Sequence, residues 1–173
     1  DIQAYYIISA DEIENSGKAD LDASFTMRWD KNRLLLSVMT TDDVFSQEYS
    51  GGDTWQGDGI QFALHAFTPE TANLDHHDFD VALTKAGPAA FRQAGVGALK
   101  PGPAPELRPQ AARNGSQVRY DVEIPASSFG VPELRAGMGI GFSLLVNDSD
   151  GKGRKGYLRW GDGIGASKDP SLY

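Results

Sequence analysis

Alternation of hydrophobic and polar residues dominates this chain, and it predicts β-strands along most of its length. In residues 21–29, LDASFTMRW, every second side chain is apolar, so all the apolar side chains of an extended strand would share one face. The same period of two recurs near residues 34–38, 60–64, 79–83, 118–124, 138–146 and 158–160. No segment of useful length carries the 3.6-residue period of a helix. The pattern therefore indicates an all-β protein.

Turn-forming residues separate these segments and indicate how the strands connect. Clusters of Gly, Pro, Asp and Asn between many short strands are typical of an antiparallel β-sandwich. Residues 96–109, VGALKPGPAPELRP, contain too many prolines for a central strand and are predicted to be a loop. Residues 125–130, PASSFG, are predicted to form a single helical turn. A length of 173 residues fits one domain over 1–173, which we expect to be a module excised from a longer protein.

The charge and composition of the chain limit the kinds of partner that we expect it to bind. The net charge is −8, with an isoelectric point near 4.8, which disfavours nucleic acid and anionic membrane surfaces as partners. The chain has no cysteine, which excludes disulfides, thiolate metal sites and cysteine nucleophiles. No apolar run reaches the roughly 18 residues of a transmembrane helix. We therefore expect neither a nucleic-acid nor a membrane partner.

The three tryptophans fall into two classes. Trp29 and Trp160 have the same strand parity as neighbouring apolar residues, so both are predicted to lie in the core. Trp55 belongs to no alternating face, because glycines and Asp53 surround it. An aromatic side chain in such a turn favours contact with a ligand, and packing of the loop itself is the alternative.

Polar residues on the opposite face of the predicted strands supply further candidates. If the strands are neighbours, this face places amides, a carboxylate, a phenol and a guanidinium near Trp55. An aromatic plane can stack on the C–H face of a sugar while planar polar groups bind its hydroxyls. A solvated sheet face is the alternative. The predicted ligand-binding residues are Trp55, Gln61, Asp80, Asn147, Tyr157 and Arg159.

Two acidic segments are candidate metal sites. NDSDGKG places Asp148 and Asp150 in a glycine-containing turn, and TTDDVF places Asp42 and Asp43 at a strand end. Carboxylate oxygens favour a hard cation, so the expected ion is calcium in a structural role, and ordinary turns are the alternative. His76 and His77 are adjacent and would point to opposite faces of a strand, which makes them a poor joint ligand pair.

Catalytic motifs are not evident. No segment has the context of a Ser-His-Asp triad, a nucleophile elbow or a phosphate-binding loop. Nothing in the sequence pairs carboxylates such as Asp58, Asp78 and Asp80 across a cleft, as a glycosidase would require. We therefore expect a protein that binds without catalysis.

Several segments together resemble carbohydrate-binding module family 9, in the order that the family shows. The resemblance extends from about Leu21 to Tyr173. It rests on MRWDKNRLLLSVMTTDDVF, TWQGDGIQFAL, YDVEIPASSFG, IGFSLLVNDSDGKGRKGYLRWGD and ASKDPSLY. It implies a jelly-roll-like β-sandwich with structural calcium. It also implies a secreted bacterial module that is covalently linked to a catalytic domain acting on polysaccharide.

The family's sugar slot lies between two tryptophans, and Trp55 matches the first of them. The position of the second reads Ser167, and Gln61 stands where the family has an acidic residue. Leu145 replaces a glutamine, and the position of an arginine aligns near Asp80. The resemblance thus implies a module for poly- or oligosaccharides, but it does not imply the family's usual chain-end specificity. A different sugar, a shifted site, and a scaffold domain that has lost its site all stay open.

A second class of function comes from related sandwich folds of the DOMON type, which bind haem through Met and His or Lys and transfer electrons. Met39 and His65 are the pair that this chain would offer. The alternative prediction is therefore a haem-binding electron-transfer module.

Overall fold

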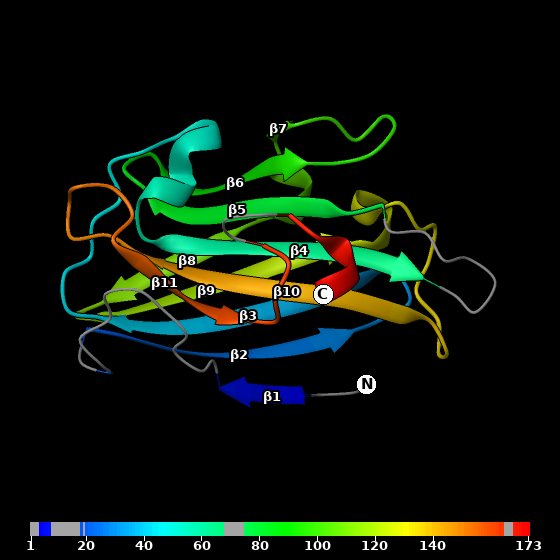
Figure 1. Ribbon diagram of the computed structural model, residues 1–173, viewed down its shortest axis with the longest axis horizontal. Coiled ribbons are helices and arrows are strands. Elements are labelled where there is room, and N and C mark those ends of the chain that lie inside the picture. The colour runs from blue at the N-terminus through cyan, green and yellow to red at the C-terminus, as the bar shows by residue number, and fades with distance from the viewer. Residues whose placement is uncertain (1–3, 8–17, 19, 68–74, 165–167) are drawn as a thin grey trace.

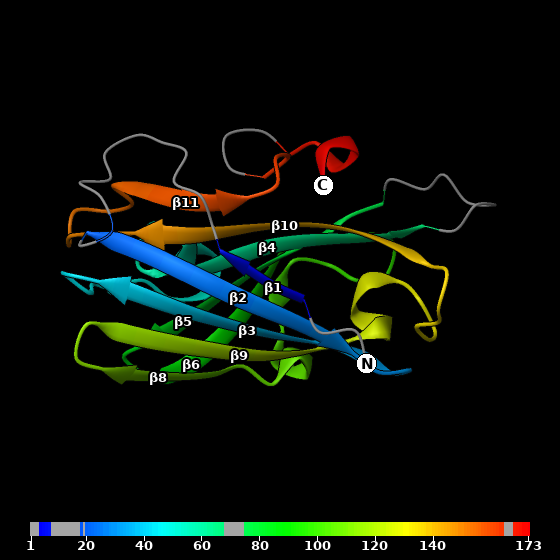
Figure 2. The ribbon, with the colours of Figure 1, turned by 90° about the horizontal axis from the view of Figure 1, so that it is seen from below.

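The computed structural model describes residues 4–7, 18, 20–67, 75–164 and 168–173. Two antiparallel sheets pack face to face, and the strand axes of the two sheets are roughly aligned (Figures 1 and 2). This arrangement confirms the predicted antiparallel β-sandwich.

The first sheet has five strands in the order β1-β2-β3-β9-β8. Their bounds are β1 Ala4–Ile7, β2 Leu21–Trp29, β3 Arg33–Asp42, β9 Gln117–Pro125 and β8 Gln110–Asn114. The second sheet has six strands in the order β11-β10-β4-β5-β6-β7. Their bounds are β11 Gly156–Trp160, β10 Gly139–Asp148, β4 Gly59–Phe67, β5 His77–Thr84, β6 Gly87–Ala94 and β7 Gly102–Pro103.

Short 3₁₀ turns lie between the strands and after the last of them. They are η1 Gly51–Gln56, η2 Pro105–Leu107, η3 Ala126–Phe129 and η4 Pro170–Leu172. The turn η3 confirms the helical turn predicted over 125–130. Residues 96–109 hold only the two-residue edge strand β7 and η2, which agrees with the predicted loop. Within the described residues, no helix has the length and apolar character needed to cross a membrane.

The core lies between the sheets and is built from the alternating apolar residues. Phe62 of β4 and Phe79 of β5 are fully buried, and their rings stack with centroids 5.3 Å apart. Trp29 and Trp160 are partly buried and pack against the core, as their parity predicted. Both border an apolar cavity of about 490 Å³ between the sheets, whose lining also includes Phe25, Met27 and Phe142.

Two strands of the structure lack the alternation that marked the others. The strand β6 has the sequence GPAAFRQA and is only partly buried along most of its length. The edge strand β8, QAARN, is mostly exposed. Both form because they pair with β5 and β9, respectively. Pairing with a well-formed neighbour therefore determines their conformation, and their own apolar pattern does not.

A buried polar cluster lies at the edge of the core between β5 and β6. The Arg92 guanidinium donates a hydrogen bond to the Ser128 carbonyl oxygen at 2.8 Å and forms an ion pair with Glu106 at 2.9 Å. It lies 4.4 Å from the centre of the Phe79 ring, and its Nη1 is 3.3 Å from Nδ1 of His77. Burial of His77, together with the positive charges of Arg92 and His76, lowers its pKa to about 4.

This shifted pKa predicts that His77 makes the fold less stable in mild acid. Between pH 6.5 and about 4, the unfolded chain binds a proton at His77 that the folded protein does not bind, so stability falls as the pH falls through this window. The full effect of a shift of this size is about 3 kcal/mol. Replacing His77 by Gln should remove this contribution, so the stability of the variant relative to wild type should rise as the pH falls through this window, as measured by urea unfolding at several pH values. A variant whose pH dependence matches that of wild type would contradict the assignment.

The C-terminal segment covers part of the outer face of the six-stranded sheet, as both ribbon views show for η4 (Figures 1 and 2). Ile164 packs on Ala63 of β4 and Leu145 of β10 in a small second cluster. Lys168 forms an ion pair with the buried carboxylate of Asp78 on β5. The outer face is therefore partly covered.

Candidate functional site

The turn η1 presents Trp55 at one end of the six-stranded sheet, and side chains from neighbouring elements fix this turn. The Gln47 amide donates hydrogen bonds to the carbonyl oxygens of Thr54 at 3.0 Å and of Asp58 at 2.7 Å. The Gln93 amide donates to the carbonyl oxygen of Gly52 at 2.6 Å. A side chain at position 57 would collide with the Gln47 amide, which explains the glycine there. Trp55 is thus held half-buried on a rigid turn.

Asp80 of β5 lies directly beneath this turn and is 2 % exposed. Its Oδ2 accepts hydrogen bonds from Gln93 Nε2 at 2.5 Å and from Thr54 Oγ1 at 3.3 Å. Its Oδ1 has no hydrogen-bond partner among the described residues. Burial raises the pKa of Asp80 to about 7, against the opposing effect of these hydrogen bonds and of the Arg154 charge. Asp80 therefore anchors η1 to the sheet.

Arg154, in the connection between β10 and β11, lies between two aromatic rings. Its guanidinium carbon is 4.9 Å from the centre of the Trp55 ring and 5.1 Å from the centre of the Tyr157 ring. Its Nη1 donates a hydrogen bond to Oδ1 of Asn147 at 3.4 Å. Asn147 on β10 and Tyr157 on β11 are directly paired across the two strands. Arg154 thus joins three of the predicted ligand-binding residues.

The other two predicted ligand-binding residues, Gln61 and Arg159, direct their polar groups to other partners. Gln61 is paired with Asp80 across β4 and β5, but its amide donates to the carboxylate of Asp78 at 3.3 and 3.4 Å. Arg159 is paired with Leu145 and forms an ion pair with Asp162 at 3.1 Å. These two side chains share the outer face of the six-stranded sheet.

The structure therefore brings Trp55, Asp80, Asn147 and Tyr157 together around Arg154. Asp80 and Asn147 are each 2 % exposed, whereas Trp55, Tyr157 and Arg154 are half-buried and reach the surface. The exposed groups can offer a stacking surface and N–H donors, and the buried groups hold them in place. Sequence reasoning missed Arg154, because it lies in the turn-rich segment SDGKGRKG, where strand parity gives no information.

The residues proposed for haem lie far apart. Met39 faces outward on the five-stranded sheet and is 37 % exposed, whereas His65 lies on the outer face of the opposite sheet. The core separates the two side chains, so they cannot bind one iron together. The described lining of the apolar cavity contains methionine but no histidine. Met39 and His65 therefore do not support the alternative of a haem-binding module.

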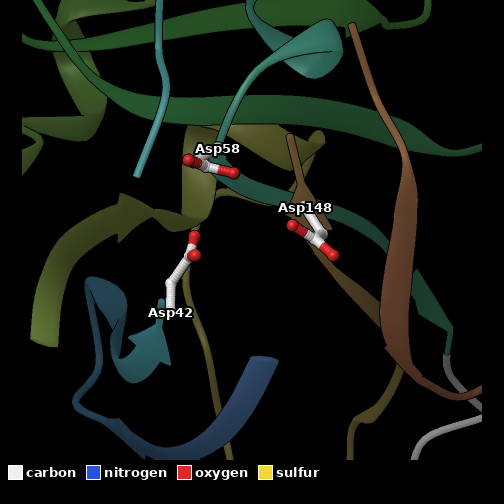
Figure 3. A group of neighbouring side chains, drawn as sticks. All are labelled: Asp42, Asp58 and Asp148. Carbon is white, nitrogen blue, oxygen red and sulfur yellow. The ribbon is translucent and has the colours of Figure 1, made fainter. Parts of the chain in front are cut away.

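A second cluster consists of three buried carboxylates from strand ends that are distant in sequence. Asp42 ends β3, Asp58 directly precedes β4, and Asp148 ends β10. Each is 2 % exposed, and ligand oxygens from all three lie within 4.8 Å of one another. Figure 3 shows the three side chains pointing towards a common space. Asp42 and Asp148 were predicted metal ligands, and the structure adds Asp58.

Electrostatics make this cluster unfavourable without a cation. Burial, followed by the charges of neighbouring carboxylates, raises the pKa of Asp58 to about 8, although it accepts backbone hydrogen bonds from Ser46 and Ser149. Burial also raises the pKa values of Asp42 and of Asp148, the latter to about 6. Calcium binds oxygen at about 2.3–2.6 Å, so ligands on opposite sides of the ion lie about 5 Å apart. The spacing and the chemistry of the three residues thus fit calcium.

The remaining predicted metal ligands lie outside this cluster. Asp43 follows Asp42 but is exposed. Asp150 forms an ion pair with Lys155 at 3.1 Å, and the same ammonium group lies 2.7 Å from Asp20 and 3.6 Å from Asp148. Lys155 therefore neutralises the charge beside the triad. Ser167, the position of the second family tryptophan, lies outside the described residues.

Comparison with known proteins gives the same fold. A carbohydrate-binding module family 9 from Caldicellulosiruptor kristjanssonii in complex with glucose has a TM-score of 0.66 and 19 % identity, over 91 % of this chain and 77 % of that one. Its complex with cellotriose matches with the same score and identity, over 98 % and 79 %.

A third solved structure, a putative carbohydrate-binding protein from Bacteroides uniformis, has a TM-score of 0.66 and 13 % identity, over 98 % of this chain and 83 % of that one. No curated protein matches. The family model described as "Carbohydrate family 9 binding domain-like" matches residues 2–173. The chain thus belongs to the carbohydrate family 9 binding domain-like family, a family of binding modules.

Proposed function

We propose that this protein binds a poly- or oligosaccharide through the surface around Trp55 and does not act on it chemically. The observation that carries the proposal is Trp55 itself, a half-buried indole on a rigid turn beside Tyr157 and Arg154. Arg154 covers one face of the indole, so a sugar ring would stack on the indole surface that Arg154 leaves open. Asp80 and Asn147 position these groups from beneath.

Membership of the family supports this proposal, as do the neighbours solved with glucose and with cellotriose. A binding module holds a polymer without catalysing a reaction on it. We further propose that the module is secreted and is covalently linked to a domain that degrades polysaccharide, so that it keeps the enzyme on its substrate.

Replacing Trp55 by Ala should weaken saccharide binding about tenfold. Stacking of a sugar on an indole contributes about 1–2 kcal/mol, and 1.4 kcal/mol corresponds to a factor of ten in affinity. Affinity electrophoresis against a panel of neutral and acidic polysaccharides, followed by calorimetry, measures the change.

Phe67→Ala is the matched control, because this aromatic residue is 43 % exposed at the opposite end of β4. Equal affinities of wild type and Trp55→Ala would remove Trp55 from the site. Failure of wild type to bind any glycan on the panel would refute the proposed function and favour a scaffold role.

We also propose that calcium binds to Asp42, Asp58 and Asp148 and stabilises the fold. Buried oxygen ligands with raised pKa values support a hard divalent cation at this place. When bound, the ion would neutralise the mutual repulsion of the three carboxylates. The residues themselves would connect the ends of β3 and β10 and the start of β4, and the ion would take no part in chemistry.

A further inference from the structure

The guanidinium group of Arg154 lies over the rings of Trp55 and Tyr157. Trp55 and Tyr157 contact the guanidinium group through their rings, at 4.9 and 5.1 Å from its carbon to the ring centres. The N–H groups of a guanidinium point outward in its own plane, so stacking does not consume them. Among the described residues, the side chain of Arg154 donates one hydrogen bond, to Asn147 at 3.4 Å. A planar set of donors is therefore fixed in orientation beside the candidate stacking surface.

Within the described residues, Arg154 has no carboxylate partner within 4.0 Å. Its neighbour Lys155 contacts three aspartates. The negative charge of Asp80 acts on Arg154 without a direct contact between the two side chains. Burial lowers the pKa of Arg154, because the partly desolvated cation is incompletely compensated. A half-buried arginine without an anion is costly unless a ligand supplies that anion.

We propose that the saccharide recognised at this site carries a carboxylate, so that the bound residue is a uronic acid, and that Arg154 binds this carboxylate through its N–H edge. This inference rests on the proposed function and names its substrate class. A planar carboxylate matches the paired donors of a guanidinium. Contact with two rings already restricts the arginine side chain, so less conformational entropy is lost when the carboxylate binds. Arg154 is thus the residue that determines specificity, and Trp55 provides stacking for acidic and neutral sugars alike.

The overall negative charge of the protein does not prevent this contact. The net charge of −8 is spread over the whole chain. At 0.15 M salt, charges separated by more than about 8 Å in solvent are largely screened, so the nearby guanidinium dominates at the site.

The experiment compares each acidic polymer with its own uncharged form. Calorimetry at 0.15 M NaCl would use oligomers of galacturonate, mannuronate and glucuronate, the methyl ester of each, a neutral cello-oligosaccharide and dextran sulfate. We expect at least one uronate to bind wild type at least tenfold more tightly than its methyl ester. Arg154→Gln should remove this preference, and Trp55→Ala should weaken the binding of both the acid and the ester.

Arg28→Gln is the matched control, because this arginine is exposed on the opposite sheet. Arg154→Lys keeps the charge but lacks the planar edge, so it should lose most of the preference. It also serves as the second variant if Arg154→Gln fails to fold. Equal binding of acid and ester, a preference for the neutral oligosaccharide, or dextran sulfate binding as tightly as the best uronate would each overturn this inference and leave carbohydrate binding intact. Absence of binding to every glycan would overturn both.

Discussion

Removing calcium should lower the melting temperature of this protein by about 10 °C. A ligand present at about a thousand times its dissociation constant stabilises the fold by about 4 kcal/mol, and each kcal/mol is worth roughly 2–4 °C for a domain of this size. The physical cause is the triad of Asp42, Asp58 and Asp148, whose carboxylates are buried within 4.8 Å of one another. Differential scanning fluorimetry in EDTA, and again after calcium is restored, measures the shift.

Two neighbouring aspartates provide the matched pair of variants for this experiment. Asp42→Asn removes a buried carboxylate of the proposed calcium site and should abolish the response to EDTA, whereas Asp43→Asn changes an exposed carboxylate and should leave the response intact. Elemental analysis of the purified protein measures bound metal directly. Identical melting curves with and without EDTA, together with no bound metal, would show that the triad holds no ion.

Replacing Phe62 by Ala should destabilise the fold by about 3–5 kcal/mol, a further large effect. The side chain is fully buried between the sheets, and its ring stacks on Phe79 at 5.3 Å. Truncation would remove this contact and leave a cavity that close-packed neighbours fill only in part. Urea unfolding followed by tryptophan fluorescence gives the difference in the free energy of unfolding.

Phe67→Ala tests the same substitution in the same strand at a position that is 43 % exposed. The Phe67→Ala variant should lose about 1 kcal/mol in the free energy of unfolding, because little apolar surface is removed from water at this position on folding. Similar losses at positions 62 and 67 would contradict the assignment of the core.

The strands that face the core could be predicted from sequence because burial of one face imposes a period of two. Phe62 and Phe79 belong to such patterns, and the structure buries both. The strand β6 could not be found in this way, because its alanines and Pro88 carry little apolar contrast. Its conformation follows from hydrogen bonds to β5, which are not visible in a local pattern.

The residues of the candidate sites could also be predicted only in part from the sequence. Trp55 could be identified because a large aromatic residue among glycines departs from every strand pattern. Arg154 and Asp58 could not be assigned to their clusters, because each depends on contacts between segments far apart in the chain. Strand parity also predicted polar side chains on the outer face, but not that Gln61, Asp80 and Asn147 would be buried there.

The connection between β10 and β11 gives the two proposed sites a common element (Figure 1). Asn147 and Arg154 belong to the surface around Trp55, whereas of the next residues along the chain, Asp148 belongs to the carboxylate triad and Lys155 lies beside it. An ion that orders this hairpin would lessen the entropy lost when a saccharide binds, which makes the two equilibria thermodynamically linked. Such coupling is reciprocal, so the saccharide would raise the affinity for calcium by the same factor by which calcium raises the affinity for the saccharide. Adhesion to a polymer would then respond to the calcium concentration around it.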